Sequence, residues 1–363
     1  MARNNGKITH GDTITHLLVI RLSAMGDVAI SAPIIYTLAT NHPTLRITIL
    51  TKRFYGPIFS AIPNASVYYA DVKGKHKGMI GLWKLYKELR ALRIDAVADL
   101  HNVLRSNILK FFFKSDGIPF PQISKGRDNK KALTAKNNKV FKQLKTTSQR
   151  YIDVFSSLGF SLNLNNTLLF PKQLLSDHTL KIIGSNAQKW VGVAPFAAFE
   201  GKRYPLHLME DVLQALDNTK KYKILLFGGG KEEREQLNSL EEKFECGINM
   251  TGKLTFQEEL ALISNLDLML SMDSGNAHLA AMYGIPVVTL WGVTHPYAGF
   301  YPIKQARDNA LLANRDKYPL IPTSVYGNKM PSGYEKAMET ISPEAVFQKI
   351  EMVLRKGNSA SIP

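Results

Sequence analysis

The residues best suited to chemistry stand in the stretch Ser271 to Ala281, SMDSGNAHLAA, which follows the apolar run Leu266 to Leu270. Its Asp-Ser-Gly turn is predicted to end a strand and open a helix. The first backbone N–H groups of a helix lack partners, and the helix dipole places positive charge there, so such a turn suits an anionic phosphate. We interpret Met272 to Asn276 as a candidate phosphate cradle. The alternative is that Asp273 or Ser274 only caps the helix, since both residue types are favoured there.

A second candidate, Asp27, comes after the apolar run His16 to Leu22, which is typical of a buried parallel strand. The loop Ser23 to Asp27 leads into Val28 to Thr40, whose apolar residues recur at helical spacing. Asp27 is therefore predicted at a helix N-terminus on the carboxyl end of a strand, where open α/β sheets bind ligands. Its ionised carboxylate can accept a proton from a hydroxyl nucleophile. Capping of the helix is the alternative role, and it does not exclude the first.

Further polar groups at predicted strand ends carry a weaker signal. His101 follows the strand predicted at Asp95 to Leu100 and could act as a ligand or base, although a histidine there is more often a structural donor. The glycines 228–230 follow the strand predicted at Lys223 to Phe227 and permit close approach of a ligand to the backbone. Glu232, at the start of the next helix, can contact a ribose hydroxyl, but the helix dipole alone also favours an acid there.

The charge of the chain points to an anionic partner. Its 46 lysines and arginines against 30 acidic residues give a formal net charge of +16, which suits nucleic acid, an acidic membrane leaflet or phosphorylated substrates. Much of the excess falls in a basic segment, Lys125 to Arg150, whose single acid is Asp128. A solvated basic loop is one interpretation, and an anionic glycolipid or membrane partner is the other. Nucleic acid is disfavoured because these basic residues are not regularly interleaved with aromatic ones.

Composition also bears on the compartment. No apolar run is long enough to span a bilayer, and the polar N-terminal stretch lacks the apolar core of a signal peptide. The single cysteine, Cys246, has no partner for an intramolecular disulfide or a zinc site, which agrees with a reducing compartment. We therefore expect a cytoplasmic protein, and Cys246 is expected to be a packing residue.

Strand and helix signals alternate along the chain, interrupted by the polar, asparagine-rich region 161–186. With 363 residues the chain is long for one core. The pattern predicts two doubly wound α/β domains that face each other over a cleft, the usual location of ligands. We place the N-terminal domain at residues 1–175 and the second at 176–340. A helix within 341–363 is expected to pack back toward the N-terminal domain, and Phe111 to Phe113 is expected to finish a strand.

Five sequence stretches, in this order, resemble glycosyltransferase family 9, the ADP-heptose:lipopolysaccharide heptosyltransferases. They are LSAMGDVAISAP, IDAVADLHNVLRSNIL, GVAPFAAFEGKRYP, LLFGGGKEER and NMTGKLTFQEELALISNLDLMLSMDSGNAHLAAMYGIPVVTLWGVTHP. The resemblance extends from His16 to about Pro302. It implies the GT-B fold, in which two Rossmann-like domains face a central cleft. It also implies transfer of a heptose from ADP-heptose to a lipopolysaccharide inner-core acceptor, with inversion and without a metal.

Inversion in one displacement needs a base on the acceptor side and stabilisation of the departing diphosphate on the other. The resemblance implies that Asp27 is the base. It implies that Lys202, in the GKRYP stretch, neutralises the diphosphate, with the adjacent Arg203 as a second candidate. On the acceptor side it suggests the loop that contains His101, Arg105 and Ser106. The partners expected are a nucleotide sugar, an anionic glycolipid and the inner leaflet of the membrane, without nucleic acid.

The same resemblance gives roles to the stretch described first. It implies that Ser274 and Gly275 hold phosphate through their backbone amides, and that Asp273 and His278 lie near the donor sugar and its phosphates. No Asp-x-Asp pair stands at a predicted strand end, so a metal-held diphosphate has no obvious ligands. We therefore expect no cofactor, with charge neutralised by Lys202 and the helix dipole.

Two stretches match no motif of the family, namely the basic segment and Tyr318 to Tyr334. The sequence therefore leaves the identity of the acceptor open. A nucleotide-sugar epimerase of the same fold would need no acceptor, and a non-catalytic sugar-nucleotide or glycolipid binding protein would show binding without turnover. Conversion of the nucleotide sugar alone would indicate the epimerase.

Overall fold

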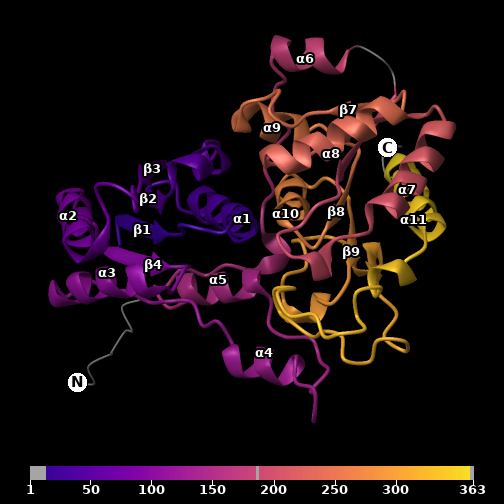
Figure 1. Cartoon of the computed structure of the whole chain (residues 1–363). Helices are drawn as coiled ribbons and strands as arrows, with labels where there is room; N and C mark the ends of the chain where they lie inside the picture. Colours follow the sequence, from indigo (N-terminus) through magenta and orange to yellow (C-terminus); the bar gives the residue numbers. More distant parts are fainter. Residues whose placement is uncertain (1–13, 185–187, 360–363) are drawn as a thin grey trace. The chain divides into compact units, whose positions relative to one another are not determined.

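A computed structural model describes residues 14–184 and 188–359 of the chain. The chain forms two compact units (Figure 1). The first contains the chain up to Lys125 together with Thr147–Phe170, and the second contains Gly126–Thr146 and the chain from Pro171 onward. The predicted boundary at residue 175 thus lies close to the last change of unit. The prediction did not foresee that the basic residues between 126 and 146 belong to the second unit.

The first unit is built on a parallel sheet with the strand order β3-β2-β1-β4. Apolar residues fill β1 on both faces, as expected of a strand that is covered by helices on each side. The strands are β1 (His16–Ile20), β2 (Arg46–Thr51), β3 (Ala65–Tyr69) and β4 (Ala96–Asp99). The helices are α1 (Met25–Asn41), α2 (Gly78–Ala91), α3 (Leu104–Ser115) and α5 (Thr147–Ser156), with the 3-10 helices η2 (Arg53–Phe59) and η3 (Leu164–Asn166).

The second unit is built on a longer parallel sheet with the order β10-β9-β8-β5-β6-β7. Its strands are β5 (Lys189–Ala194), β6 (Tyr222–Leu226), β7 (Gly247–Asn249), β8 (Leu268–Met272), β9 (Val287–Trp291) and β10 (Ala310–Leu312). Its helices are α4 (Arg127–Leu133), α6 (Asp177–Ile183), α7 (Leu206–Asn218), α8 (Gly230–Lys243), α9 (Phe256–Ile263), α10 (Gly275–Met282) and α11 (Pro343–Ser359). Short 3-10 turns are η4 (Glu200–Lys202), η5 (Pro296–Ala298), η6 (Arg307–Asn309) and η7 (Met338–Thr340).

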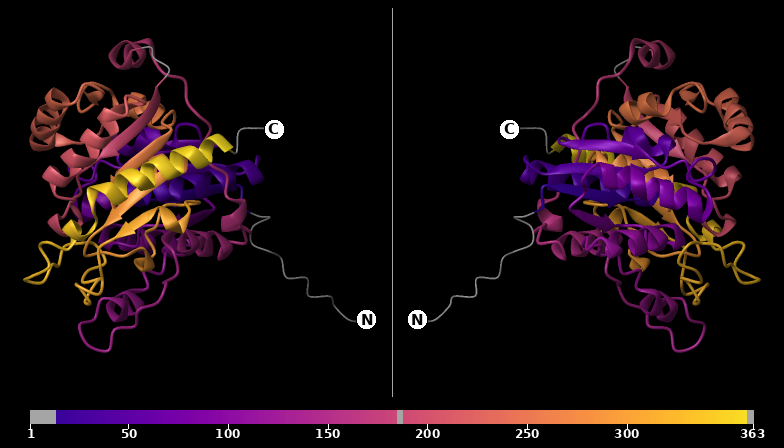
Figure 2. Two further views of the ribbon diagram at one scale, coloured as in Figure 1. Left: turned by 90° about the vertical axis from the view of Figure 1, so that its right-hand side faces the viewer. Right: turned by 90° about the vertical axis from the view of Figure 1, so that its left-hand side faces the viewer.

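The C-terminal helix packs on the core of the second unit. The apolar side chains Val346, Ile350 and Leu354 of α11 belong to the core of the second unit, together with Leu213 of α7. Figure 2 shows α11 in yellow beside the strands of that sheet. The apolar face of α11 is thus used within the second unit, and its predicted packing toward the N-terminal domain stays a prediction.

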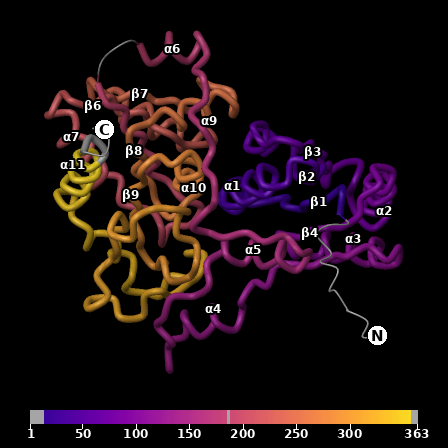
Figure 3. Tube along the Cα trace, turned by 180° about the vertical axis from the view of Figure 1, so that it is seen from behind, coloured from indigo at the N-terminus to yellow at the C-terminus, as the bar shows by residue number. Residues whose placement is uncertain are grey.

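Two local predictions also need correction. Phe111 to Phe113 does not finish a strand but lies in α3, where Phe113 is buried and Phe111 is exposed. The basic segment is not simply a solvated loop, because it contains α4 and buries Leu133 and Leu144 beside Ala298. Figures 1 and 3 show this segment next to the loops that follow β9. Within the described residues no helix is both long enough and apolar enough to cross a membrane.

Candidate active site

Asp27 lies in the first turn of α1, at the carboxyl end of β1, as predicted. The cap of this helix is Ala24, and no side chain caps the helix start. Asp27 therefore does not serve as the N-cap. Its carboxylate instead forms an ion pair with the Arg21 guanidinium. About a quarter of the Asp27 side chain remains exposed (27%), whereas that of Arg21 is 7% exposed, so the carboxylate keeps partial access to solvent.

Arg21 is held in place by groups around it. A second nitrogen of its guanidinium donates to the carbonyl oxygen of Leu100, and the guanidinium carbon lies 5.8 Å from the centre of the Tyr151 ring. The Tyr151 hydroxyl donates to the backbone oxygen of Asp27 over 3.3 Å. Burial raises the pKa of Tyr151, so this phenol stays protonated. Arg21 and Tyr151 together hold Asp27 from the protein interior, and the exposed side of the carboxylate is left for a ligand.

His101 follows β4, the strand next to β1, so it lies at the same sheet edge as Asp27. Its Nε2 lies 3.5 Å from Ser23 Oγ, and its Nδ1 is buried without a hydrogen-bond partner in the described residues. Burial first, and then the positive charges of Arg21, Lys125, Lys52 and Arg105, lower the pKa of His101 to about 3. The imidazole is therefore neutral near pH 7 and can act as a hydrogen-bond partner but not as a charged ligand.

The two other residues predicted on the acceptor side differ in their surroundings. Ser106 is completely buried, and its hydroxyl accepts from the Val103 backbone N–H and donates to the Val103 carbonyl. It thereby fixes the start of α3, so its predicted contact with an acceptor is withdrawn. Arg105 is exposed beside it and stays a prediction.

In the second unit, the predicted turn between β8 and α10 is present. Asp273 follows β8 directly, Ser274 is the cap residue, and α10 begins at Gly275. The Ser274 hydroxyl does not cap the helix but lies 3.0 Å from Ser271 Oγ. The first N–H groups of α10 thus receive no side-chain cap, which is the condition that favours an anion at a helix start.

Asp273 is buried and has two partners. Its Oδ2 lies 2.9 Å from Lys202 Nζ and accepts a hydrogen bond of 3.0 Å from Thr294 Oγ1. A lysine ammonium carries three donors. Lys202 can therefore stay paired with Asp273 and still offer protons to an anion at the α10 start. The 15% exposure of its side chain leaves it accessible to a ligand.

Backbone contacts fix the position of Lys202. The Gly201 carbonyl accepts from Val293 N over 2.9 Å, and a Cβ on Gly201 would lie 2.5 Å from Val293. The side chain of Lys202 runs along Gly327, where a Cβ would lie 2.4 Å from Lys202 Cγ. The neighbouring Arg203 is largely exposed, and its Nε donates to the Ala197 carbonyl. Of the two predicted cations, Lys202 is the one paired with Asp273.

The remaining predicted donor residues lie on nearby elements of this unit. His278 is buried on α10, in the same helix that Gly275 begins. Glu232 is exposed in the first turn of α8. The neighbouring Glu233, and not Glu232, accepts the hydrogen bond from Gly229 N, over 2.7 Å. The Glu232 carboxylate thus makes no hydrogen bond or ion pair within the described residues and is available to a hydroxyl.

Two contributing residues were missed from the sequence. Arg21 directly follows the apolar strand β1, and a charged residue at such a position is a signal that could have indicated it. Thr294 stands 21 residues after Asp273, and nothing in the spacing announces their hydrogen bond. No group of three or more His, Cys, Asp or Glu side chains in the described part of the chain could hold a metal ion.

Comparison with known proteins decides the family. The model of glycosyltransferase family 9 (heptosyltransferase) matches residues 82–324, more than half of the chain. The chain belongs to glycosyltransferase family 9. It is 26% identical over 361 residues to the lipooligosaccharide heptosyltransferase 2 of Haemophilus influenzae, covering 94% of this chain and 100% of that relative. Family 9 membership confirms the predicted resemblance and makes the chain a glycosyltransferase.

Solved structures agree on the fold. The family 9 glycosyltransferase of Veillonella parvula has a TM-score of 0.73 at 20% identity and covers 97% of this chain and 100% of its own. The ADP-heptose lipopolysaccharide heptosyltransferase II of Escherichia coli has a TM-score of 0.67 at 20% identity, with coverage of 94% and 99%. The predicted GT-B class, with two Rossmann-like α/β domains, is confirmed for this family 9 chain.

Proposed function

We propose that the chain transfers a heptose from ADP-heptose to a sugar hydroxyl of a lipopolysaccharide inner core, with inversion and without a metal. The observation that carries the proposal is the turn at the start of α10, where Lys202 pairs with Asp273 beside uncapped helical N–H groups. A cation and a helix dipole directed at one point stabilise the negative charge of a departing diphosphate. The named activities of the relatives support heptose as the sugar and ADP as the nucleotide.

The chemical step follows from these roles. The acceptor hydroxyl oxygen attacks C1 of the donor sugar while the bond between C1 and the phosphate oxygen breaks, and ADP departs with the electron pair. The Asp27 carboxylate takes the hydroxyl proton as general base. Attack from the side opposite the leaving group inverts C1. Ser274, Gly275 and Lys202 hold the diphosphate. His278 and Glu232 are proposed to contact the donor, with Arg203 as a further cation, and His101 and Arg105 to contact the acceptor.

Contact with a lipid surface belongs to the proposal, at the cytoplasmic face of the inner membrane. Large apolar side chains are exposed on two helices that pack side by side, α2 and α3. They are Met79 (61% exposed), Ile80 (72%) and Trp83 (47%) on α2, and Leu104 (76%) and Phe111 (72%) on α3. The same helices carry the basic residues Lys84, Lys87, Arg90, Arg105, Lys110 and Lys114. Exposed apolar groups among cations favour the interface of an anionic leaflet.

The proposed reaction is tested by Asp27→Asn and Asp27→Ala. Transfer from ADP-heptose to a lipopolysaccharide core acceptor, followed by mass spectrometry, should fall about 100-fold or more in both variants. Calorimetry should show ADP affinity within a factor of about two of the parent. Asp177→Asn, which changes an exposed acid in the first turn of α6, is the matched control. Unchanged turnover in Asp27→Asn would remove Asp27 as the base, and conversion of ADP-heptose without an acceptor would favour an epimerase.

A further inference from the structure

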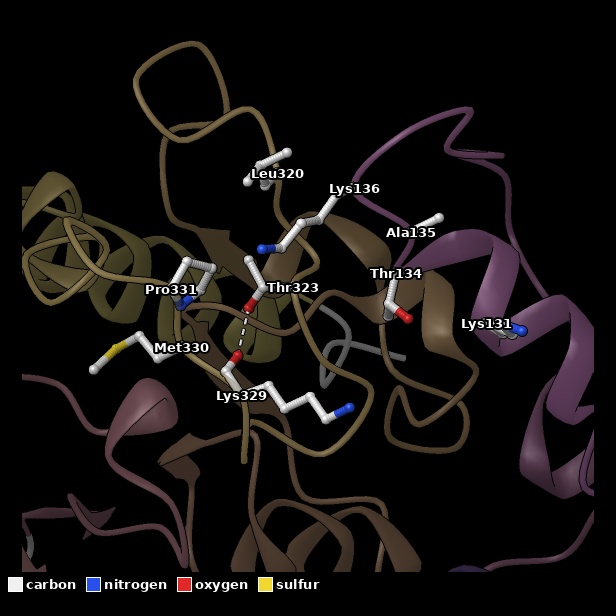
Figure 4. Close-up of a pocket in the computed structure, with 9 residues that line it drawn as sticks. All are labelled: Lys131, Thr134, Ala135, Lys136, Leu320, Thr323, Lys329, Met330 and Pro331. Atoms are coloured by element: carbon white, nitrogen blue, oxygen red, sulfur yellow. Dashed lines mark hydrogen bonds between the residues drawn. The ribbon is translucent and has the colours of Figure 1, made fainter.

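The two stretches to which the sequence analysis assigns no motif meet in one pocket of the second unit. The cavity has a volume of about 500 Å³. Figure 4 shows that residues between Lys131 and Lys136 form one of its walls and residues between Leu320 and Pro331 form the other. The first wall comes from the basic segment and the second from the Tyr318 to Tyr334 stretch. We call this cavity the lysine pocket, after Lys131, Lys136 and Lys329.

The wall contributed by the basic segment is a folded part of the unit. Lys139 Nζ donates to the carbonyl oxygens of Leu133 (3.1 Å), Leu320 (2.9 Å) and Pro322 (2.8 Å), which ties the end of α4 to the opposite wall. Burial, followed by the charge of Arg315, lowers the pKa of Lys139. The guanidinium of Arg315 lies 3.5 Å from the centre of the Phe141 ring. Because the Lys139 ammonium already donates to three carbonyl oxygens, its role is structural. The lysines left to bind a ligand are those that line the pocket.

The opposite wall is built by a closed turn that reaches the donor half of the site. Thr323 Oγ1 donates to the Lys329 carbonyl over 2.7 Å, as drawn in Figure 4. The backbone N–H of Thr323 donates to the Val293 carbonyl over 3.0 Å. Val293 immediately precedes Thr294, whose hydroxyl donates to Asp273, the partner of Lys202. The pocket wall and the proposed diphosphate turn are therefore joined by consecutive hydrogen bonds within one unit.

The charges of the pocket are of one sign. None of Lys131, Lys136 and Lys329 forms an ion pair with any described residue, and no acidic residue lines the cavity. Like charges gathered in a concave, partly apolar space attract an anion, because the anion removes their mutual repulsion. The lining also includes the Thr134 hydroxyl and an apolar part from Leu320, Met330 and Pro331, but no aromatic ring on which a nucleobase would stack.

We propose that the lysine pocket binds a phosphate monoester carried by the acceptor saccharide. A phosphate monoester has a charge near −2 at pH 7 and accepts several hydrogen bonds, which suits lysine ammonium groups. The donor diphosphate has its own turn at the start of α10, so the pocket is left for the other substrate. This inference rests on the proposed function, because it names a group of the acceptor in the same transfer.

Direct binding tests the pocket without requiring turnover. The probe is a deacylated, water-soluble lipopolysaccharide core saccharide with its phosphate monoesters, compared by calorimetry with the same saccharide after phosphatase treatment. Lys136→Glu with Lys329→Glu should weaken binding of the phosphorylated saccharide about 10-fold to 100-fold, since hydrogen bonds to charged groups are among the stronger ones. Binding of the phosphatase-treated saccharide should be weak and nearly equal in parent and variant. The milder pair Lys136→Gln with Lys329→Gln should give an intermediate loss.

The matched control is Lys142→Glu with Lys336→Glu. Both lysines are exposed, belong to the same region as the two walls and line no part of the pocket. The control carries the same change in charge, so a loss of affinity as large as that of the pocket variant would reduce the effect to long-range electrostatics and overturn the proposal. Thermal unfolding of all variants near that of the parent shows that the fold is retained.

Other outcomes reassign the pocket. A weakened affinity for ADP in the pocket variant would place the donor there and overturn the inference, as would equal loss for both saccharides. Vesicles with anionic phospholipid that lose binding to the variant, while the phosphorylated saccharide does not, would make the pocket a membrane contact instead. If the parent binds the phosphorylated saccharide through these lysines but transfers no sugar from ADP-heptose, the proposed reaction fails while the pocket stands.

Discussion

Arg21 and Asp27 form an ion pair at the carboxyl end of β1, in which the arginine is buried and the aspartate keeps an exposed side. The buried partner also donates to the Leu100 carbonyl and lies over the Tyr151 ring. The Asp27 carboxylate is thus held by a buried residue, Arg21, which has further contacts of its own. Because the side chain of Arg21 is buried, we expect it to affect the proposed reaction only through the orientation of Asp27.

Loss of Arg21 should therefore lower turnover without weakening the binding of the donor. In Arg21→Gln we expect kcat to fall about 10-fold to 100-fold, which corresponds to roughly 1.4 to 2.7 kcal/mol in the barrier. The Kd for ADP should change less than about threefold, because Arg21 and the α10 turn are in different units. Arg21→Lys keeps the charge but loses the fork geometry, so it should recover part of the rate. A lower kcat in Arg21→Gln with an unchanged Kd for ADP, and partial recovery of kcat in Arg21→Lys, would support a positioning role for Arg21. Equal losses in kcat and ADP affinity would contradict it.

Lys202 should control affinity for the diphosphate. Lys202→Met removes the cation beside the α10 start and leaves the carboxylate of Asp273 without its ion-pair partner. Both effects weaken the binding of a diphosphate, and we expect the Kd for ADP to rise about 10-fold to 100-fold. Calorimetry with ADP and with adenosine separates charge from base recognition, since adenosine affinity should stay nearly constant. Lys231→Met, which removes an exposed lysine of the same unit on α8, should leave both affinities unchanged. A similar loss for adenosine would mean that the site has unfolded locally.

The apolar side chains exposed on α2 and α3 should bind lipid. Ile80→Glu with Phe111→Glu places acids in the proposed interface, and cosedimentation with vesicles rich in anionic phospholipid should fall to a small fraction of the parent value. Transfer to a water-soluble acceptor should be retained, because neither residue belongs to the proposed chemistry. Leu174→Glu, at a side chain that is 96% exposed in the second unit, is the control and should bind vesicles like the parent. Retained cosedimentation in the double variant would remove this face from the membrane contact.

Glu259 on α9 should make stability depend on pH. Burial raises the pKa of its carboxyl from 4.5 to about 7. A raised pKa in the folded state means that the protonated form is favoured, so this stabilisation is complete below about pH 4.5 and is lost as the pH rises through 7. Glu259→Gln should therefore match the parent at pH 5 and exceed it at pH 8 by about 1 to 3 kcal/mol in the free energy of unfolding.

Urea unfolding at the two pH values measures this difference. Glu242→Gln, at an exposed glutamate of α8, should change neither value appreciably. Equal stabilisation by Glu259→Gln at pH 5 and pH 8 would show that the effect comes from packing and not from ionisation.

The sheets could be predicted because their strands are short apolar runs separated by turns. The runs at His16 to Leu22 and Leu266 to Leu270 became β1 and β8, and the helix starts after them placed Asp27 and Asp273 correctly. Phe111 was mistaken for part of a strand. It lies in α3 with its apolar side chain exposed, so the apolar residues of this helix do not follow a strict 3.6-residue pattern.

The contacts of the candidate site could be predicted only in part. The Asp-Ser-Gly turn pointed to Asp273 and the family resemblance pointed to Lys202, but their ion pair joins residues 71 positions apart, from the turn η4 and the end of β8. Likewise, the hydrogen bonds from Lys139 to Leu320 and Pro322 connect distant stretches that share no periodicity. Such pairings follow from tertiary packing, which local sequence patterns do not encode.

The membership of residues 126–146 in the second unit has a practical consequence for dissecting the enzyme. The polypeptide passes between the units after Lys125, after Thr146 and after Phe170, so no single cut separates them. A fragment that starts at Pro171 would lack Leu133 and Leu144 and would expose Ala298 to water. It would also lack Lys145, whose backbone carbonyl lies close to Gly299. The second unit alone, for crystallography or NMR, must therefore be made as a permuted chain, with residues 126–146 rejoined by a linker to the portion that begins at 171.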